Sequence, residues 1–125
     1  MKFSEREKRM LTWTVLLVAL FVLLTGCSKE IIISSGDLAQ VEIANVTILF
    51  SFKDQVITCY NDNKEWAEVE IRRWNSDTQS YLKIFHEGVC GYGEISREAS
   101  FEHGDDIKIR VKIEGQEIIR YYILG

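Results

Sequence analysis

The segment from Ile107 to Ile113 alternates apolar and cationic residues without a break. This period of two is typical of a β-strand that buries one face and leaves the other in water. Glu114 and Gly115 follow, and residues 116–124 form a second segment that is rich in Ile and Tyr. Two residues that include a glycine between two such segments predict a tight hairpin. The Lys and Arg side chains of the first strand are either a solvated face that protects a sheet edge or a binding stripe.

The chain between residues 41 and 102 predicts further short strands separated by polar turns. The apolar residues of segment 41–52 change parity part-way along, so a bulge or break is expected near Ala44-Asn45. Strands are also predicted at residues 55–60, 66–74, 81–85 and 99–102, with a glycine-rich irregular segment at 88–93. About six to eight short strands with regular turn signals predict an all-β fold. Its architecture would be a small β-sandwich, immunoglobulin-like or transthyretin-like, or a small barrel.

Residues 1–26 have the composition of a signal peptide. An unbroken apolar core spans residues 15–24 and follows a basic start that contains Lys2, Arg6, Lys8 and Arg9. The segment ends in Leu24-Thr25-Gly26-Cys27, which resembles the lipobox of bacterial lipoproteins. The resemblance implies a signal-peptide helix, cleavage before Cys27, and attachment of lipid, palmitate included, to that cysteine.

A lipid on Cys27 would hold the mature chain at the cell membrane, or at the outer membrane facing the periplasm if the source has two membranes. The alternatives are an uncleaved transmembrane anchor and ordinary secretion. A helix over residues 11–26 would rise only about 24 Å, whereas the hydrocarbon core of a membrane is roughly 30 Å thick. The short apolar segment therefore favours the lipoprotein.

The predicted organisation is a signal peptide over 1–26, a lipidated cysteine and short tether over 27–36, and a β domain over 37–125. Four of the 15 Lys/Arg and two of the 19 Asp/Glu residues lie in the signal peptide, which leaves a mature formal charge of −6. Such a surface repels nucleic acid and anionic lipid and attracts a basic protein. Because basic and aromatic residues are not interleaved, a nucleic-acid partner is not expected.

Cys59 and Cys90 remain in the mature domain besides the lipidated cysteine. Outside the cytoplasm two cysteines most simply pair, and a bridge that closes a loop of about 30 residues would stabilise the domain by roughly 3.5 kcal/mol. Metal ligation and a catalytic thiol are the alternatives. His86 lies four residues before Cys90, but no set of four zinc ligands can be assembled around it.

No catalytic constellation is found in the sequence. His86 and His103 are the only histidines, and the Glu102–Asp106 cluster reads as a hydrated turn and not as a metal site. We therefore expect no enzymatic activity, no cofactor and no metal. Aromatic residues are candidates for a contact surface, since Trp and Tyr often anchor interfaces. The candidates are Trp66, Trp74, Tyr81, Tyr92, Tyr121 and Tyr122, with Trp66 and Tyr121 chosen as partner-binding residues.

The overall layout resembles small periplasmic lipoproteins linked to type VI secretion, immunity lipoproteins in particular. The shared features are a short signal with a lipobox, a compact β domain, two cysteines and a Tyr-rich C-terminal strand. The resemblance implies a protein-binding domain in the cell envelope that intercepts a secreted toxin. The alternatives are a structural accessory lipoprotein of a secretion apparatus and a lysozyme-inhibitor-like lipoprotein, although the Ser-Gly-rich inhibitory loop of the latter is not found.

Overall fold

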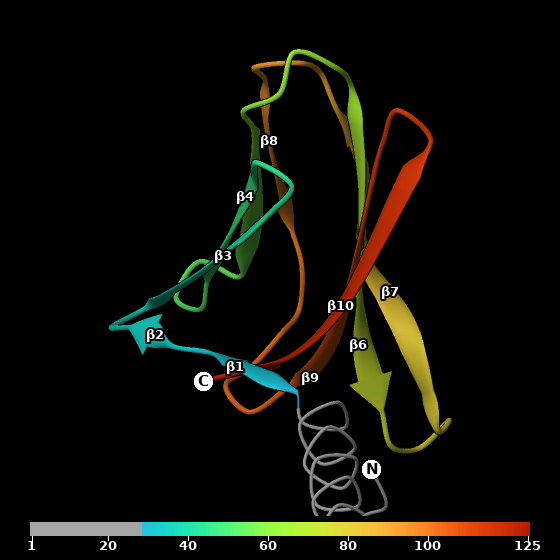
Figure 1. Cartoon of the computed structure of the whole chain (residues 1–125). Helices are drawn as coiled ribbons and strands as arrows, with labels where there is room; N and C mark the ends of the chain where they lie inside the picture. The colour runs from blue at the N-terminus through green and yellow to red at the C-terminus, as the bar shows by residue number, and fades with distance from the viewer. Residues whose placement is uncertain (1–28) are drawn as a thin grey trace, which may run out of the picture.

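The computed structural model describes residues 29–125, so the predicted signal peptide and Cys27 lie outside the described residues. Within residues 29–125, ten strands form two packed sheets without any helix, as Figure 1 shows. The first sheet has the order β1-β10-β9-β6-β7, and the second has the order β2-β3-β4-β5-β8. Neither sheet closes on itself. The prediction of an all-β fold is confirmed, and its architecture is a sandwich and not a barrel.

The strands differ in length, and the longest belong to the first sheet. That sheet consists of β1 (Glu30–Ile32), β10 (Gln116–Leu124), β9 (Asp106–Ile113), β6 (Ala67–Asn75) and β7 (Ser80–Val89). The second sheet consists of β2 (Ser34–Ser35), β3 (Leu38–Ile43), β4 (Val46–Ser51), β5 (Val56–Asn61) and β8 (Glu94–Glu98). No helix among the residues described here is long and apolar enough to cross a membrane.

The core lies between the two sheets because each strand turns its apolar residues to the same side. In β4 the side chains of Val46, Ile48 and Phe50 are buried, and the residues between them face outward. Strands β6 and β9 likewise bury every second residue, namely Ala67, Val69, Ile71, Ile107, Ile109 and Val111. Phe101, in the connection between β8 and β9, completes the core, with its ring centre 5.4 Å from that of Phe50. Removal of this apolar surface from water is the main force that holds the sheets together.

Two tight hairpins follow the sequence closely. The turn between β9 and β10 has positive φ at both Glu114 (50°) and Gly115 (78°), as a two-residue hairpin requires. The turn between β3 and β4 has the same form, with φ of 50° at Ala44 and 60° at Asn45. The change of parity in segment 41–52 is therefore a hairpin turn between two strands, not a bulge within one.

The domain begins earlier than predicted. The sequence predicts a tether over residues 27–36, but β1 pairs in parallel with β10 and β2 pairs antiparallel with β3. The short segment Glu30–Ile32 has no clear alternation, and its strand conformation depends on a partner more than 80 residues away. The part of the chain between Cys27 and the domain is correspondingly short.

The strand predicted at 99–102 is wrong. The strand in this part of the chain is β8, at Glu94–Glu98, which pairs with β5. The backbone of Phe101 is instead tied to the side chain of Gln55, whose Oε1 accepts from the Phe101 N–H at 3.1 Å and whose Nε2 donates to the Phe101 carbonyl at 3.0 Å. A glutamine side chain thus replaces a strand partner.

The basic strand β9 does not lie at an edge of its sheet, because β10 and β6 flank it. Its cations therefore do not serve as edge protection.

The predicted disulfide between Cys59 and Cys90 is wrong, because both thiols are free in the structure. Cys59 points into the core from β5 and is fully buried. Cys90 follows Val89, whose side chain faces the core, so alternation directs the Cys90 side chain outward, where it is exposed. A disulfide requires the two Cβ atoms to point toward each other. Burial raises the pKa of the Cys59 thiol to about 12.

Candidate protein-binding site

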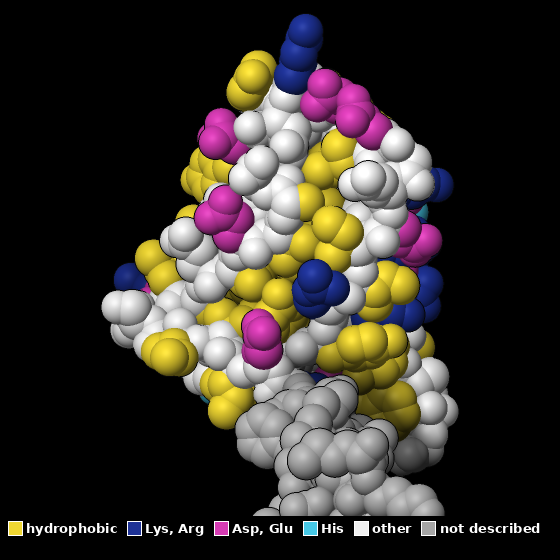
Figure 2. Space-filling view, viewed as in Figure 1, with side chains coloured by type: hydrophobic (Ala, Val, Ile, Leu, Met, Phe, Trp, Pro, Cys, Tyr) yellow, Lys and Arg dark blue, Asp and Glu magenta, His cyan; other side chains and the backbone are white. Residues whose placement is uncertain are grey.

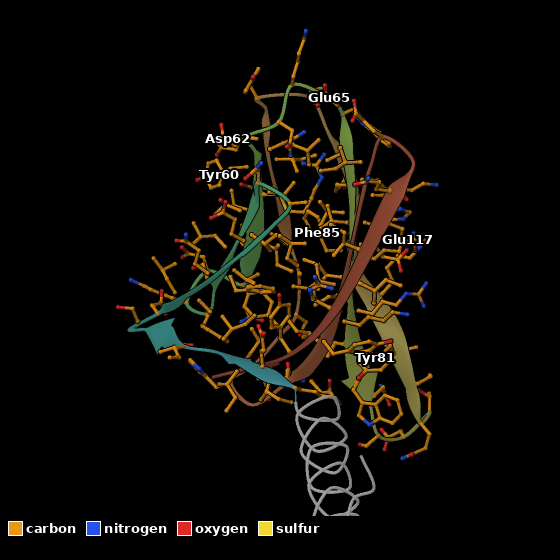
Figure 3. The ribbon with its side chains drawn as sticks, in the orientation of Figure 1. Tyr60, Asp62, Glu65, Tyr81, Phe85 and Glu117 are labelled. Atoms are coloured by element: carbon orange, nitrogen blue, oxygen red, sulfur yellow. The ribbon has the colours of Figure 1, made fainter. Side chains whose placement is uncertain are left out.

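Three connections meet at one end of the sandwich, which we call the loop end. They are the β3–β4 turn (44–45), the β5–β6 loop (62–66) and the β7–β8 loop (90–93). In Figure 3, Tyr60, Asp62 and Glu65 mark this end, and Tyr81 lies at the opposite end of the molecule. Loops at the end of a rigid sandwich are a common position for binding residues.

A buried amide joins two of these loops. Asn61 is the last residue of β5, and its side chain points inward at 2% exposure. Its Nδ2 group lies within hydrogen-bond distance of the carbonyl oxygens of Glu65 (2.8 Å), Val89 (3.1 Å) and Cys90 (3.3 Å). Its Oδ1 accepts from the backbone N–H of Asn63 at 3.0 Å. A buried polar group that is fully paired in this way makes its surroundings rigid.

Further hydrogen bonds connect all three loops. The Asn63 side chain donates to the carbonyl of Ala44 at 2.8 Å, and the N–H of Asp62 donates to the carbonyl of Asn45 at 3.0 Å. The N–H of Tyr92 donates to the carbonyl of Asn63 at 2.9 Å. Each of the three loops is therefore hydrogen-bonded to a neighbouring loop through at least one backbone group.

The β7–β8 loop carries conformational strain beside an exposed ring. A Cβ atom at Gly91 would collide with the carbonyl oxygen of Lys64, so only glycine fits between the two loops. Tyr92 adopts a φ of 56°, which is unusual for a bulky residue and costs of order 1–3 kcal/mol. Its side chain is nevertheless 72% exposed. Strained residues are common at binding sites, so the strain and the exposure of the ring together make Tyr92 a candidate contact residue.

The loop end presents aromatic rings among carboxylates. Tyr60 (39% exposed) and Tyr92 line a shallow hollow of about 340 Å³ together with Asp62 and Glu94. Figure 2 shows Asp and Glu side chains near this end of the molecule and one basic side chain at its tip, above apolar side chains that lie lower between the sheets. Carboxylates beside aromatic faces attract cations, through charge-assisted hydrogen bonds and through the ring quadrupole. The hollow is suited to an Arg or Lys side chain.

Trp66 lies on the other side of the loop end, over the first sheet. A Cβ atom at Gly88 would lie 2.5 Å from Cζ2 of the indole, so the ring packs directly on the glycine backbone of β7. The ring is still 55% exposed. Gly88 is therefore needed to seat the indole, which explains a glycine inside a regular strand.

The two histidines are engaged elsewhere. His86 Nε2 lies 2.6 Å from Oε1 of Glu68, and this hydrogen bond lowers the pKa of the Glu68 carboxyl. His103 Nδ1 lies 2.7 Å from the carbonyl oxygen of Gly125, and its ring stacks on Phe52 with centres 3.7 Å apart. Among the described residues, no group of three or more His, Cys, Asp or Glu is arranged to hold a metal ion.

The structure separates the two residues chosen from the sequence. Trp66 lies at the loop end, whereas Tyr121 lies in the other half of the first sheet, opposite Lys108 of β9. Tyr121 faces outward and its neighbour Tyr122 is buried, as strand alternation requires. The pairing of Tyr60 with Tyr92 was missed. The turn-forming sequences Asn61-Asp62-Asn63 and Gly91-Tyr92-Gly93 were the available signals, but neither shows that the two turns meet.

No protein-family model matches the chain, and no curated protein or solved structure matches it.

Proposed function

We propose that the chain is a membrane-anchored bacterial lipoprotein whose β domain binds a basic protein in the cell envelope. One observation carries the proposal: a hydrogen-bonded loop end that exposes Tyr60, Trp66 and Tyr92 among carboxylates. Binding by loops that are already fixed loses little conformational entropy, and exposed Tyr and Trp rings supply contact area at low entropic cost.

The partner presents Arg or Lys to the hollow between Tyr60 and Tyr92. The acidic side chains Asp62 and Glu94, which line it, speed the encounter with a positively charged surface. An immunity protein that captures a secreted toxin fits this chemistry, and it is the role we favour. A structural role in a secretion apparatus and inhibition of a basic lysozyme would use the same surface. In each role the domain binds and does not catalyse.

The position of the anchor supports this arrangement. The Lys29 side chain forms an ion pair with Asp106 and lies 3.4 Å from the hydroxyl of Tyr81, so the chain is fixed to the domain at this residue. The hydrogen bond to Asp106 raises the pKa of Lys29 and keeps its ammonium group charged. Cys27 precedes Lys29 by two residues, so its lipid would begin within about 7 Å of the Lys29 backbone. Tyr81 and the loop end lie at opposite ends of the molecule (Figure 3), which leaves the loop end accessible to a partner.

The test is site-specific photocrosslinking of the full chain in its own membranes. A photoreactive residue at Tyr60 or Tyr92 should give one discrete adduct, and mass spectrometry should identify the same basic protein from both positions. Matched controls are Thr58 and Ser96, which face outward from neighbouring strands of the same sheet and hydrogen bond to each other at 2.8 Å. Equal adducts at the control positions, or none at the two tyrosines, would contradict the proposed binding site. Cys27→Ser tests the anchor separately, since it should abolish lipid labelling.

A further inference from the structure

The outward-facing cations of the strands lie on only one of the two outer faces of the sandwich, and carboxylates lie on both. The outward positions of the second sheet carry Glu42, Glu94 and Glu98 and no Lys or Arg. The outward positions of the first sheet carry five cations, Arg72, Lys83, Lys108, Arg110 and Lys112, and four carboxylates, Glu68, Glu70, Asp106 and Glu117. Carboxylates neutralise the cations at the loop-end half of this face, where Arg110 pairs with Glu68, Glu70 and Glu117. Lys83 and Lys108, which pair with no carboxylate of the described residues, lie in its other half.

Three of these cations lie directly opposite one another. Arg72 of β6 is paired in register with Lys83 of β7 on one side and with Lys108 of β9 on the other. Like charges in opposed positions destabilise a sheet. Of these three cations, only Arg72 has a carboxylate partner, which is Glu70 at 2.5 Å. The amino group of Lys108 lies 6.0 Å from the ring centre of Tyr121, and no carboxylate of the described residues pairs with it.

Aromatic rings lie beside this row of cations. The ring centres of Trp74 and Tyr81 are 5.0 Å apart, and those of Tyr81 and Tyr121 are 5.8 Å apart. Trp74 and Tyr121 are exposed although they contact Tyr81. We call the six residues the aromatic–basic patch: Arg72, Trp74, Tyr81, Lys83, Lys108 and Tyr121.

The patch lies where the chain leaves the domain toward its anchor, because Tyr81 is in hydrogen-bond contact with Lys29. We propose that the aromatic–basic patch rests on anionic lipid headgroups of the membrane to which the chain is attached. This inference depends on the anchor of the proposed function. Trp and Tyr side chains favour the interface between membrane and water, and Lys and Arg residues are attracted to anionic lipid.

The membrane contact gives the domain an orientation. A tethered patch meets the membrane at high effective concentration, so a contact that would be weak for a free protein is sufficient. The opposed cations gain the counter-charge that the sheet does not provide. The loop end, at the opposite end of the molecule, is then held away from the membrane and toward the partner.

Tryptophan fluorescence tests this orientation, because Trp66 and Trp74 lie at the two ends of one face. Mature lipidated chains with either Trp66→Phe or Trp74→Phe, from which cleavage before Cys27 has removed Trp13, are reconstituted in phosphatidylglycerol vesicles, with and without bromine on the acyl chains. Brominated lipid should quench most of the emission of Trp74 and leave that of Trp66 unchanged. Equal quenching of both residues, or no quenching of Trp74, would overturn the proposal.

A charge reversal isolates the patch. The double variant Lys83→Glu with Lys108→Glu should release Trp74 from quenching, since each basic residue contributes roughly fivefold to binding at an anionic surface. The variant should fold, because both changes place a carboxylate opposite Arg72. The matched control, Lys53→Glu with Lys64→Glu, changes the net charge equally at exposed positions outside the patch and should keep Trp74 quenched.

The quenching and photocrosslinking experiments together separate this inference from the proposed function. A crosslinked partner at Tyr92 together with unquenched Trp74 would refute the membrane contact and leave partner binding intact. Quenched Trp74 without a partner at Tyr92 would refute the binding site and support the contact. Loss of the wild-type chain from the membrane fraction would refute the anchor on which both depend.

Discussion

Replacement of Asn61 by Ala should loosen the loop end more than any other single change to an exposed or polar residue there. The substitution removes the amide that contacts the carbonyls of Glu65, Val89 and Cys90 and accepts from the N–H of Asn63. The contact with Val89 is fully buried, and the others are partly buried. A buried carbonyl that loses its donor costs about 1–3 kcal/mol, and each partly buried bond contributes about 0.5–1.5 kcal/mol.

The expected loss in the free energy of unfolding is about 3 kcal/mol, a large share of the 5–15 kcal/mol that is typical of a whole domain. For a domain of this size the thermal midpoint should fall by roughly 12–24 °C. Urea unfolding and a thermal scan of the full chain in detergent measure both quantities. Amide hydrogen exchange should show the loss of protection concentrated in residues 62–66 and 90–93.

Asn75→Ala is the matched control, because the same side chain there accepts from the N–H groups of Asp77 and Thr78 in an exposed turn. Water can replace those bonds, so the cost should stay within about 1 kcal/mol. If Asn61→Ala costs no more than Asn75→Ala, the argument that a buried amide organises the loop end is refuted. The photocrosslink at Tyr92 should weaken in Asn61→Ala and not in Asn75→Ala.

Three further predictions concern other parts of the domain. Alkylation with peptide mapping should label Cys90 in the folded protein and Cys59 only after unfolding. The reason is that burial excludes the reagent from Cys59 and raises the pKa of its thiol to about 12. A bridged peptide pair would contradict the free thiols. Gly91→Ala should lower the free energy of unfolding by about 1–3 kcal/mol, because the new Cβ atom would collide with the carbonyl oxygen of Lys64 in the β5–β6 loop. An unchanged urea midpoint would show that the two loops can separate. Lys108→Glu should raise the free energy of unfolding by about 0.5 kcal/mol, because it places opposite charges across from Arg72, and a destabilised variant would show that this cation is already compensated.

Local pattern determines most of the strands. The alternation in Ile107–Ile113 assigns inward and outward faces that the structure reproduces, and the outward Lys and Arg are where period two places them. The hairpin at Glu114-Gly115 also follows from local sequence, because positive φ at two adjacent residues is a property of the turn itself. Segments without such a pattern were misjudged. Residues 99–102 look like a strand, yet the side chain of Gln55 pairs with both backbone groups of Phe101.

By itself the sequence determined an all-β domain, the inward face of its long strands and the turns between them, because these depend on neighbours a few residues apart. The tertiary structure alone decided which turns meet, that Cys59 and Cys90 face apart, and that Lys83 and Lys108 flank Arg72. Those features depend on the register of strands that are distant in sequence. A shift of one residue would turn every side chain of a strand to the other face, so only the packed sheets fix the loop end and the aromatic–basic patch.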